Sequence, residues 1–287
     1  MTPALNDYLI LTKVRITALV LVTTAAGFLL ASGPRPDVAL LAWTLLGTGL
    51  AASGAAALNQ VVEREADARM RRTAGRPIPA GRMTPARGWW VGIGLAAAGV
   101  GILAVTVNLL TSLLALATVL LYVGVYTPLK RMTPLNTMVG AIPGAIPPMM
   151  GWTAVTGEAG LPAWVLFAIL FLWQLPHFLA IAWIFRDDYR LGGFPMLPVL
   201  DPDGLATGRQ AALYCAALVP VSLIPTFLGL AGPVYFFGAL VLGLAFLAAA
   251  LAMAVRRRGK EARRVLLASV TYLPLLLTLL VADRAPL

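Results

Sequence analysis

Long apolar stretches of about 17 to 23 residues, separated by shorter polar segments, dominate the chain. A helix needs about 20 apolar residues to cross the hydrocarbon core of a bilayer. The pattern therefore predicts an all-α integral membrane protein with nine transmembrane helices around a central cavity, forming one polytopic domain over residues 1–287. The predicted spans lie at about 16–32, 38–60, 88–107, 109–128, 135–156, 162–184, 210–230, 233–254 and 265–282.

The composition agrees with a membrane protein. Hydrophobic residues make up 60% of the chain and charged residues only 12%, against about 45–50% and about 25% in soluble domains. The start, MTPALNDYLILTKVR, lacks the basic, apolar and small-residue regions of a signal peptide, so we expect the first apolar segment to stay in place as a helix. The single cysteine, Cys215, excludes a disulfide within the chain and a cysteine-based zinc site.

The basic residues indicate the orientation. The net charge is +10, and only Arg35 and Arg284 of the 22 Lys and Arg residues fall outside alternate connections of the predicted bundle. By the positive-inside rule, this bias places the N-terminus and the long loops 61–87 and 185–209 in the cytoplasm. We expect a multi-pass protein of the cell's plasma (inner) membrane that contacts lipid and no nucleic acid. The basic loop 256–264 is interpreted as an anchor for anionic headgroups rather than as a catalytic loop.

Proline and glycine interrupt the fifth predicted span. Pro143, Pro147 and Pro148 lie within it, and such residues are tolerated at membrane depth where the freed backbone groups face protein or a wet cavity. We expect this span to line the central cavity. Close helix packing through small residues is the alternative.

Asn59, Glu63 and Asp67 follow one another at intervals of four residues where the second span ends. At about 100° per residue, steps of four keep the three side chains on one helix face. Polar and charged side chains at a membrane helix are costly, which makes a functional role the default hypothesis. Their oxygens suit Mg²⁺, and Mg²⁺ suits a diphosphate.

Arginines follow these acids within the same loop. Because the two signs of charge alternate, the loop favours a site that holds a metal ion and a polyanion together. A solvated loop of neutralising pairs, such as Asp67 with Arg71, is the alternative. The candidate diphosphate-binding residues are Arg15, Arg71, Arg72, Arg76 and Lys130.

Two further segments carry polar residues at the same membrane face. Tyr126 and Lys130, four apart at the inner end of the fourth span, are ordinary interface anchors on their own but would lie near the Asn59 loop. Asp187 and Asp188 follow the sixth span and are candidate metal ligands. Asp188 could instead position Arg186 or a water molecule.

His177, the only histidine, lies about two helical turns before Asp187 and therefore inside the predicted bilayer. An isolated histidine of this kind is more often hydrogen-bonded packing than a ligand. Its aromatic surroundings, with Trp173 one turn away, would suit a large flat ligand, and a neutral imidazole can ligate haem iron.

These segments resemble the membrane prenyltransferases of the UbiA superfamily. The superfamily's motif Asn-x-x-x-Asp-x-x-x-Asp is matched by Asn59, Glu63 and Asp67, and its Tyr-x-x-x-Lys motif by Tyr126 and Lys130. NQVVEREADARMRRTAGRPIPAGR, YTPLKRMTPLNTMVGAIPGAIPPMMGW and WQLPHFLAIAWIFRDDYRLGGFPMLP resemble the branch that farnesylates protohaem IX. Asp187 and Asp188 are adjacent, whereas the superfamily's second motif has acids four apart.

The resemblance implies a nine-helix fold and an Mg²⁺-dependent reaction. In that reaction the farnesyl group of farnesyl diphosphate moves to the 2-vinyl group of haem B, and water adds, which gives haem O and diphosphate. It also implies catalytic roles for Asn59, Glu63, Asp67, Tyr126 and Lys130, and a haem contact at His177. An enzyme that makes haem A is a possible downstream partner.

Two other functions fit parts of the pattern. A related prenyltransferase would use the same diphosphate site with another aromatic or tetrapyrrole acceptor. A secondary transporter would also contain broken helices and buried charges, but transporters place polar residues near the membrane midplane. The acids here cluster at one face, which favours the enzyme.

Overall fold

The protein is a bundle of long helices joined by short ones, and the computed structural model describes residues 4–285. The long helices are α2 (Val14–Ala31), α3 (Val38–Val62), α5 (Pro85–Thr106), α6 (Leu109–Leu120), α8 (Asn136–Thr156), α9 (Leu161–Ile184), α12 (Leu205–Phe227), α13 (Pro233–Arg256) and α14 (Gly259–Ala282). The short ones are α1 (Leu5–Leu11), α4 (Arg64–Arg69), α7 (Thr127–Leu129), α10 (Arg186–Leu191) and α11 (Leu197–Leu200).

Eight helices within residues 4–285 are long and apolar enough to cross a membrane. They correspond to eight of the nine predicted spans. The fourth runs unbroken over Leu109–Leu129, because a π-helical turn (Leu121–Tyr126) joins α6 to α7. The fifth predicted span, 135–156, is α8, whose 21 residues are enough to cross a membrane but are less apolar than those of the other eight helices.

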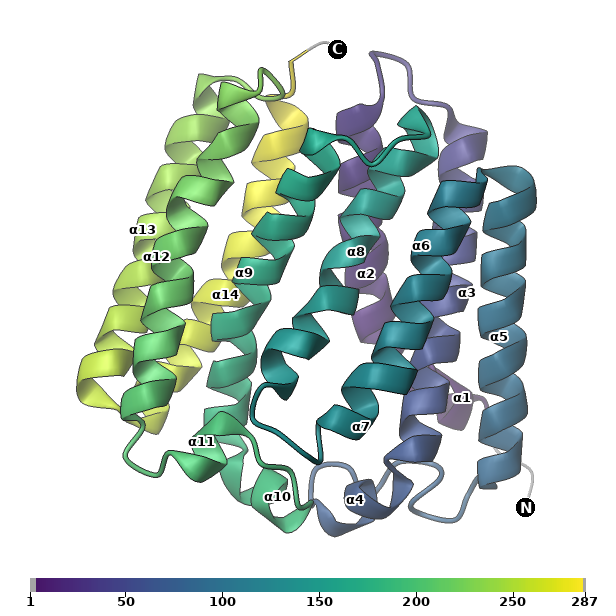
Figure 1. Cartoon of the computed structure of the whole chain (residues 1–287), viewed down its shortest axis with the longest axis vertical. Coiled ribbons are helices and arrows are strands. Elements are labelled where there is room, and N and C mark those ends of the chain that lie inside the picture. The colour runs from purple at the N-terminus through teal and green to yellow at the C-terminus, as the bar shows by residue number, and fades with distance from the viewer. Residues whose placement is uncertain (1–3, 286–287) are drawn as a thin grey trace.

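The helices pack so that neighbours in sequence are mostly neighbours in space (Figure 1). α3 packs against α2 and α5, α6 against α5 and α8, and α9 against α8, α12 and α14. The short helices α1, α4, α7, α10 and α11 lie together at one end of the bundle. That end therefore gathers the connections that the sequence marked as functional.

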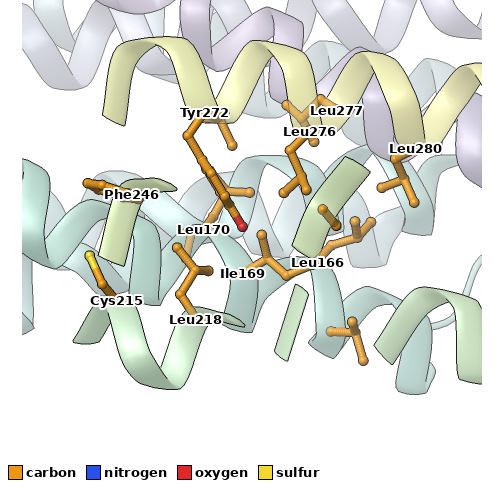
Figure 2. Packing of buried hydrophobic residues seen from close by; sticks show 14 of the residues in the cluster. Leu166, Ile169, Leu170, Cys215, Leu218, Phe246, Tyr272, Leu276, Leu277 and Leu280 are labelled. Carbon is orange, nitrogen blue, oxygen red and sulfur yellow. The ribbon is translucent and has the colours of Figure 1, made fainter. Parts of the chain in front are cut away.

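An apolar core lies between α9, α12, α13 and α14 (Figure 2). Leu166 and Ile169 of α9, Leu218 of α12, Phe246 of α13 and Tyr272 of α14 are almost fully buried within it. At the far end, Arg284 donates to the carbonyl oxygens of Leu29 and Gly33, so the end of α14 is tied to the end of α2.

α8 remains a continuous helix despite Pro143, Pro147 and Pro148, which are all buried. It packs against α2, α6 and α9. A Cβ atom on Gly27 of α2 would lie 2.0 Å from the Pro148 carbonyl oxygen, so the two backbones are in contact. The structure thus shows the close packing that was the alternative for this span.

Gly99 on α5 offers a test of the packing between α3 and α5. A Cβ atom there would lie 2.4 Å from the backbone nitrogen of Ala51, whereas one on Gly101, on the same helix, meets nothing within 4 Å. Gly99→Val should therefore destabilise the protein by about 1–3 kcal/mol, the usual cost of overpacking, and Gly101→Val by much less. Thermal unfolding in detergent compares the two; equal melting temperatures would contradict this packing.

Candidate active site

The predicted ligand face forms across a break between two helices. Asn59 lies in the last turn of α3, Glu63 ends that helix, and Asp67 lies in α4. The i to i−4 hydrogen bonds continue through the break, from Glu63 N to Asn59 O (2.9 Å) and from Asp67 N to Glu63 O (2.8 Å). The three side chains therefore keep the shared face that their spacing predicts. All three are buried, with exposures of 2%, 2% and 0%.

Each of these three residues is held by a cation from a different part of the chain. Lys13 Nζ donates to Asn59 Oδ1 at 2.9 Å. Lys130 Nζ lies 3.1 Å and 3.2 Å from the two carboxylate oxygens of Glu63. Arg76 donates to Asp67 Oδ2 at 2.5 Å. The solvated pair of Asp67 with Arg71 is not formed, since Asp67 is fully buried and Arg76 is its partner.

Lys130 is positioned by the end of the fourth long helix. The π-helical turn before it belongs to a class of distortion that is frequent at functional sites. Thr127, just after this turn, accepts a hydrogen bond from Asn59 Nδ2 (3.1 Å) and donates one to the Tyr122 carbonyl (2.8 Å). The Lys130 ammonium also lies 4.5 Å from the ring centre of Phe194 and 5.9 Å from that of Tyr126. Thus Tyr126 and Lys130 do lie beside the Asn59 loop.

The charges around Glu63 shift the pKa values of their neighbours. Burial alone would raise the pKa of Glu63, but the Lys130 and Lys13 charges outweigh it and the pKa is lowered. Burial alone would lower the pKa of Lys130, but Tyr126 and Glu63 raise it above its usual value. For Lys13, burial and then the Arg76 charge lower the pKa to about 7. Glu63 and Lys130 are therefore a charged pair at neutral pH.

Asp67 keeps one oxygen without a partner. Its Oδ1 is buried and accepts no hydrogen bond from any described residue, and such an atom is costly unless something binds it. No group of three or more His, Cys, Asp or Glu side chains within residues 4–285 could hold a metal ion. Mg²⁺ usually takes one or two carboxylates and completes its shell with water and substrate phosphates. Asn59, Glu63 and Asp67 fit that pattern.

The two long loops meet beside this cluster. Arg71 and Arg190 line a cavity of about 320 Å³ together with Asp187 and Asp188. Asp188 accepts a hydrogen bond from the backbone of Arg72 at 3.3 Å, which joins the loops.

The residues of the second loop differ in their surroundings. Asp187 is exposed and pairs with Arg190 at 3.1 Å. Arg186 lies over the ring of Trp183 at 4.8 Å, and Asp188 bonds to the first loop instead. Arg72 stacks over Phe185 at 5.2 Å. Metal binding by the two aspartates stays a prediction.

Diphosphate binding by Arg15 stays a prediction, and the structure adds Lys13 as a neighbour of the ligand set. Arg15 is exposed in the first turn of α2, whereas Lys13, just before that helix, reaches the ligand set. Sequence reasoning missed Lys13 because a lysine at a membrane boundary is typical of any cytoplasmic connection. It also missed Thr127, which no motif marks.

His177 makes the contacts expected of packing. Its Nδ1 lies 2.7 Å from Ser269 Oγ of α14, and its ring stacks on Trp173 at 5.1 Å. Trp173 Nε1 donates to the Ser269 carbonyl at 2.8 Å. Because the Ser269 hydroxyl donates to the Leu266 carbonyl at 2.6 Å, Nδ1 must carry the proton. The lone pair of His177 is therefore on Nε2, the nitrogen that remains for a metal.

The match to known proteins covers nearly the whole chain. The UbiA prenyltransferase family matches residues 20–274. The chain belongs to this family. A relative from Solibacter usitatus, named protoheme IX farnesyltransferase, is 48% identical over 98% of this chain and 99% of its own length. Family membership decides against the secondary transporter.

Solved structures share the fold. A digeranylgeranylglyceryl phosphate synthase superimposes with a TM-score of 0.81 at 16% identity, over 97% of this chain and 98% of its own. A UbiA homologue from Archaeoglobus fulgidus, solved with GPP and Mg²⁺, gives a TM-score of 0.67 at 14% identity, over 96% of this chain and 99% of its own. At these low sequence identities, the similarity shows only that this chain shares their fold.

Thr127→Val tests the internal support of the ligand set. Without the hydroxyl, the buried Asn59 Nδ2 loses its partner, which costs about 1–3 kcal/mol. The matched control is Thr118→Val on α6, whose hydroxyl bonds only to the Leu114 carbonyl of its own helix. We expect Thr127→Val to lower the melting temperature in detergent more than Thr118→Val does. The reverse order would mean that Thr127 does not support Asn59.

Proposed function

We propose that this chain transfers the farnesyl group of farnesyl diphosphate to a vinyl group of haem B, with addition of water, giving haem O and diphosphate. A diphosphate as the prenyl donor is supported by the cluster at one end of the bundle. There the buried Asn59, Glu63 and Asp67 contact Lys13, Lys130 and Arg76. Haem B as the acceptor is supported by the relative named protoheme IX farnesyltransferase, which matches over 98% of this chain.

The proposal includes an orientation in the membrane. Nine helices cross the bilayer, with α8 as the one whose composition alone does not identify it as a span. The N-terminus and the end that carries α4 and α10 face the cytoplasm, because almost all basic residues gather on those connections. The membrane is the plasma membrane, and the lipid-soluble haem product passes to an enzyme that makes haem A.

Asn59, Glu63 and Asp67 would hold Mg²⁺, with Asp187 and Asp188 as further candidate ligands from the second loop. The Archaeoglobus homologue solved with GPP and Mg²⁺ supports this choice of metal. When bound, Mg²⁺ supplies positive charge that stabilises the departing diphosphate. The buried Asp67 Oδ1, which has no hydrogen-bond partner among the described residues, would gain a partner in a bound cation.

The cationic side chains would bind the diphosphate. Lys130 and Arg76 lie beside the ligand set, and Arg71 lies at the cavity between the loops. Their N–H groups neutralise the charge that develops on the diphosphate as the allylic C–O bond breaks and its electron pair leaves with the oxygen. Arg72, which stacks on Phe185, and the exposed Arg15 are further candidates for the diphosphate.

The rest of the reaction needs an aromatic, water-poor surface. Tyr122 and Tyr126 stack at 5.4 Å beside the ligand set, and aromatic faces stabilise cations. The vinyl carbon of the haem forms the new C–C bond, and the hydroxyl of a water molecule adds to the neighbouring carbon. The remaining proton of that water is released with the diphosphate. Trp173 and His177, with Nε2 unprotonated, would contact the haem.

The function is tested by incubating the purified protein with haem B, farnesyl diphosphate and Mg²⁺ and separating the extracted haems by chromatography. We expect a more apolar haem that contains one farnesyl and one added water. If haem B is recovered unchanged while an aromatic acceptor such as a hydroxybenzoate is prenylated, haem is not the acceptor.

Asp67→Asn should reduce the rate of prenyl transfer about a hundredfold or more, because one charged oxygen of the diphosphate site is lost. The control is Asp203→Asn, an exposed residue of the second long loop. Initial rates, measured on samples whose melting temperatures confirm folding, make the comparison. Equal rates for the two variants would remove Asp67 from the metal site.

His177→Ala should weaken the haem contact without affecting the diphosphate site. The optical spectrum of haem added to the purified protein should lose the signature of nitrogen ligation, and less haem should remain after gel filtration. Farnesyl diphosphate affinity should stay unchanged. An identical haem spectrum in wild type and His177→Ala would show that the imidazole only packs against Ser269.

A further inference from the structure

Lys13 differs from the other two cations of the cluster because it has no carboxylate partner. Lys130 pairs with Glu63 and Arg76 with Asp67, whereas the polar neighbours of Lys13 Nζ are the amide oxygen of Asn59 at 2.9 Å and the Tyr122 hydroxyl at 3.4 Å. No ion pair to Lys13 exists within the described part of the chain. Both hydrogen-bond partners of Lys13 Nζ are neutral, and a charged phosphate oxygen is a stronger acceptor than either of them.

We propose that Lys13 is a diphosphate-binding residue, which rests on Asn59 while the site is empty of substrate and moves to a phosphate oxygen when metal and diphosphate bind. The inference rests on the proposed function, and it assigns a role to a residue outside both sequence motifs. In this role, Lys13 weakens the binding of a metal ion when no diphosphate is present, and it strengthens the binding of diphosphate.

The backbone holds Lys13 at this place. The residue lies between α1 and α2 in the left-handed region, at φ 49° and ψ 50°, a conformation that non-glycine residues seldom adopt. Gln60, the neighbour of Asn59, donates to the carbonyl oxygens of Ile10 and Leu11, both at 2.8 Å. One turn of α3 therefore fixes both the end of α1 and the amide that receives Lys13.

Lys13 and a metal ion compete for one oxygen. The Lys13 ammonium donates to Asn59 Oδ1, which is the only oxygen that the amide side chain offers to a metal. Two cations at such short range repel each other unless an anion lies between them. Diphosphate supplies that anion, since Lys13 can then exchange the amide oxygen for a charged phosphate oxygen, which is the stronger acceptor. Asn59 Oδ1 is released in the same exchange.

The test measures two binary affinities of the full-length protein in detergent. Mn²⁺ alone is titrated and followed by electron paramagnetic resonance, and inorganic pyrophosphate alone is titrated in the presence of a chelator and followed by calorimetry. Lys13→Met should bind Mn²⁺ about tenfold more tightly and pyrophosphate about tenfold more weakly, within the usual range of coupling between two sites. Lys13→Arg should restore pyrophosphate binding. Lys260→Met, the same change at an exposed lysine, should alter neither affinity.

The opposite signs separate this role from a structural one. If Lys13→Met weakens both affinities, or leaves both unchanged, Lys13 only supports the fold and the proposal is wrong. If the wild-type protein binds neither Mn²⁺ nor pyrophosphate, the diphosphate site itself is absent and the proposed function is wrong as well. Binding of both by wild type, with the two shifts in Lys13→Met, supports the proposal.

Discussion

Two ion pairs and one hydrogen-bonded pair at one end of the bundle position the residues of the candidate site. Asn59, Glu63 and Asp67 are buried, and a carboxylate cannot be buried at low cost without a cation beside it. Lys130 and Arg76 meet that requirement for Glu63 and Asp67, and Lys13, from a third segment, donates to the amide of Asn59. The same cations are the groups that a diphosphate requires. In the proposed function, the stability of the free protein and its affinity for the diphosphate would therefore depend on the same side chains.

The surrounding fold holds the residues of these pairs in place. The end of α3 carries Asn59, the π-helical turn and α7 lead to Lys130, and Gln60 fixes the end of α1 so that Lys13 can reach Asn59. Asp188 connects the second loop to the first through the backbone of Arg72. At the opposite end, Arg284 ties the end of α14 to the end of α2. An apolar frame with the three pairs of the cluster at one end suits a water-poor prenyl transfer.

Patterns of local origin were predictable from the sequence. Apolar length indicated the helices, and the interval of four placed Asn59, Glu63 and Asp67 on one face even though the helix breaks at Glu63, because the i to i−4 bonds continue through it. Contacts between distant segments were not predictable. Asp67 has Arg71 at helical spacing, yet Arg76 is its partner because the chain folds back after α4. Lys13 reaches Asn59 across 46 residues. The exposed pair of Asp187 with Arg190 joins residues only three apart, but nothing local placed Asp188 on Arg72.

The central claim is that these three pairs are the substrate site. An experimental structure of the protein with Mg²⁺ and a non-reactive thio analogue of farnesyl diphosphate tests it most directly. The account predicts metal density at Asn59, Glu63 and Asp67, with Lys13, Lys130 and Arg76 on phosphate oxygens. A diphosphate bound elsewhere, with all three pairs still intact, would contradict it.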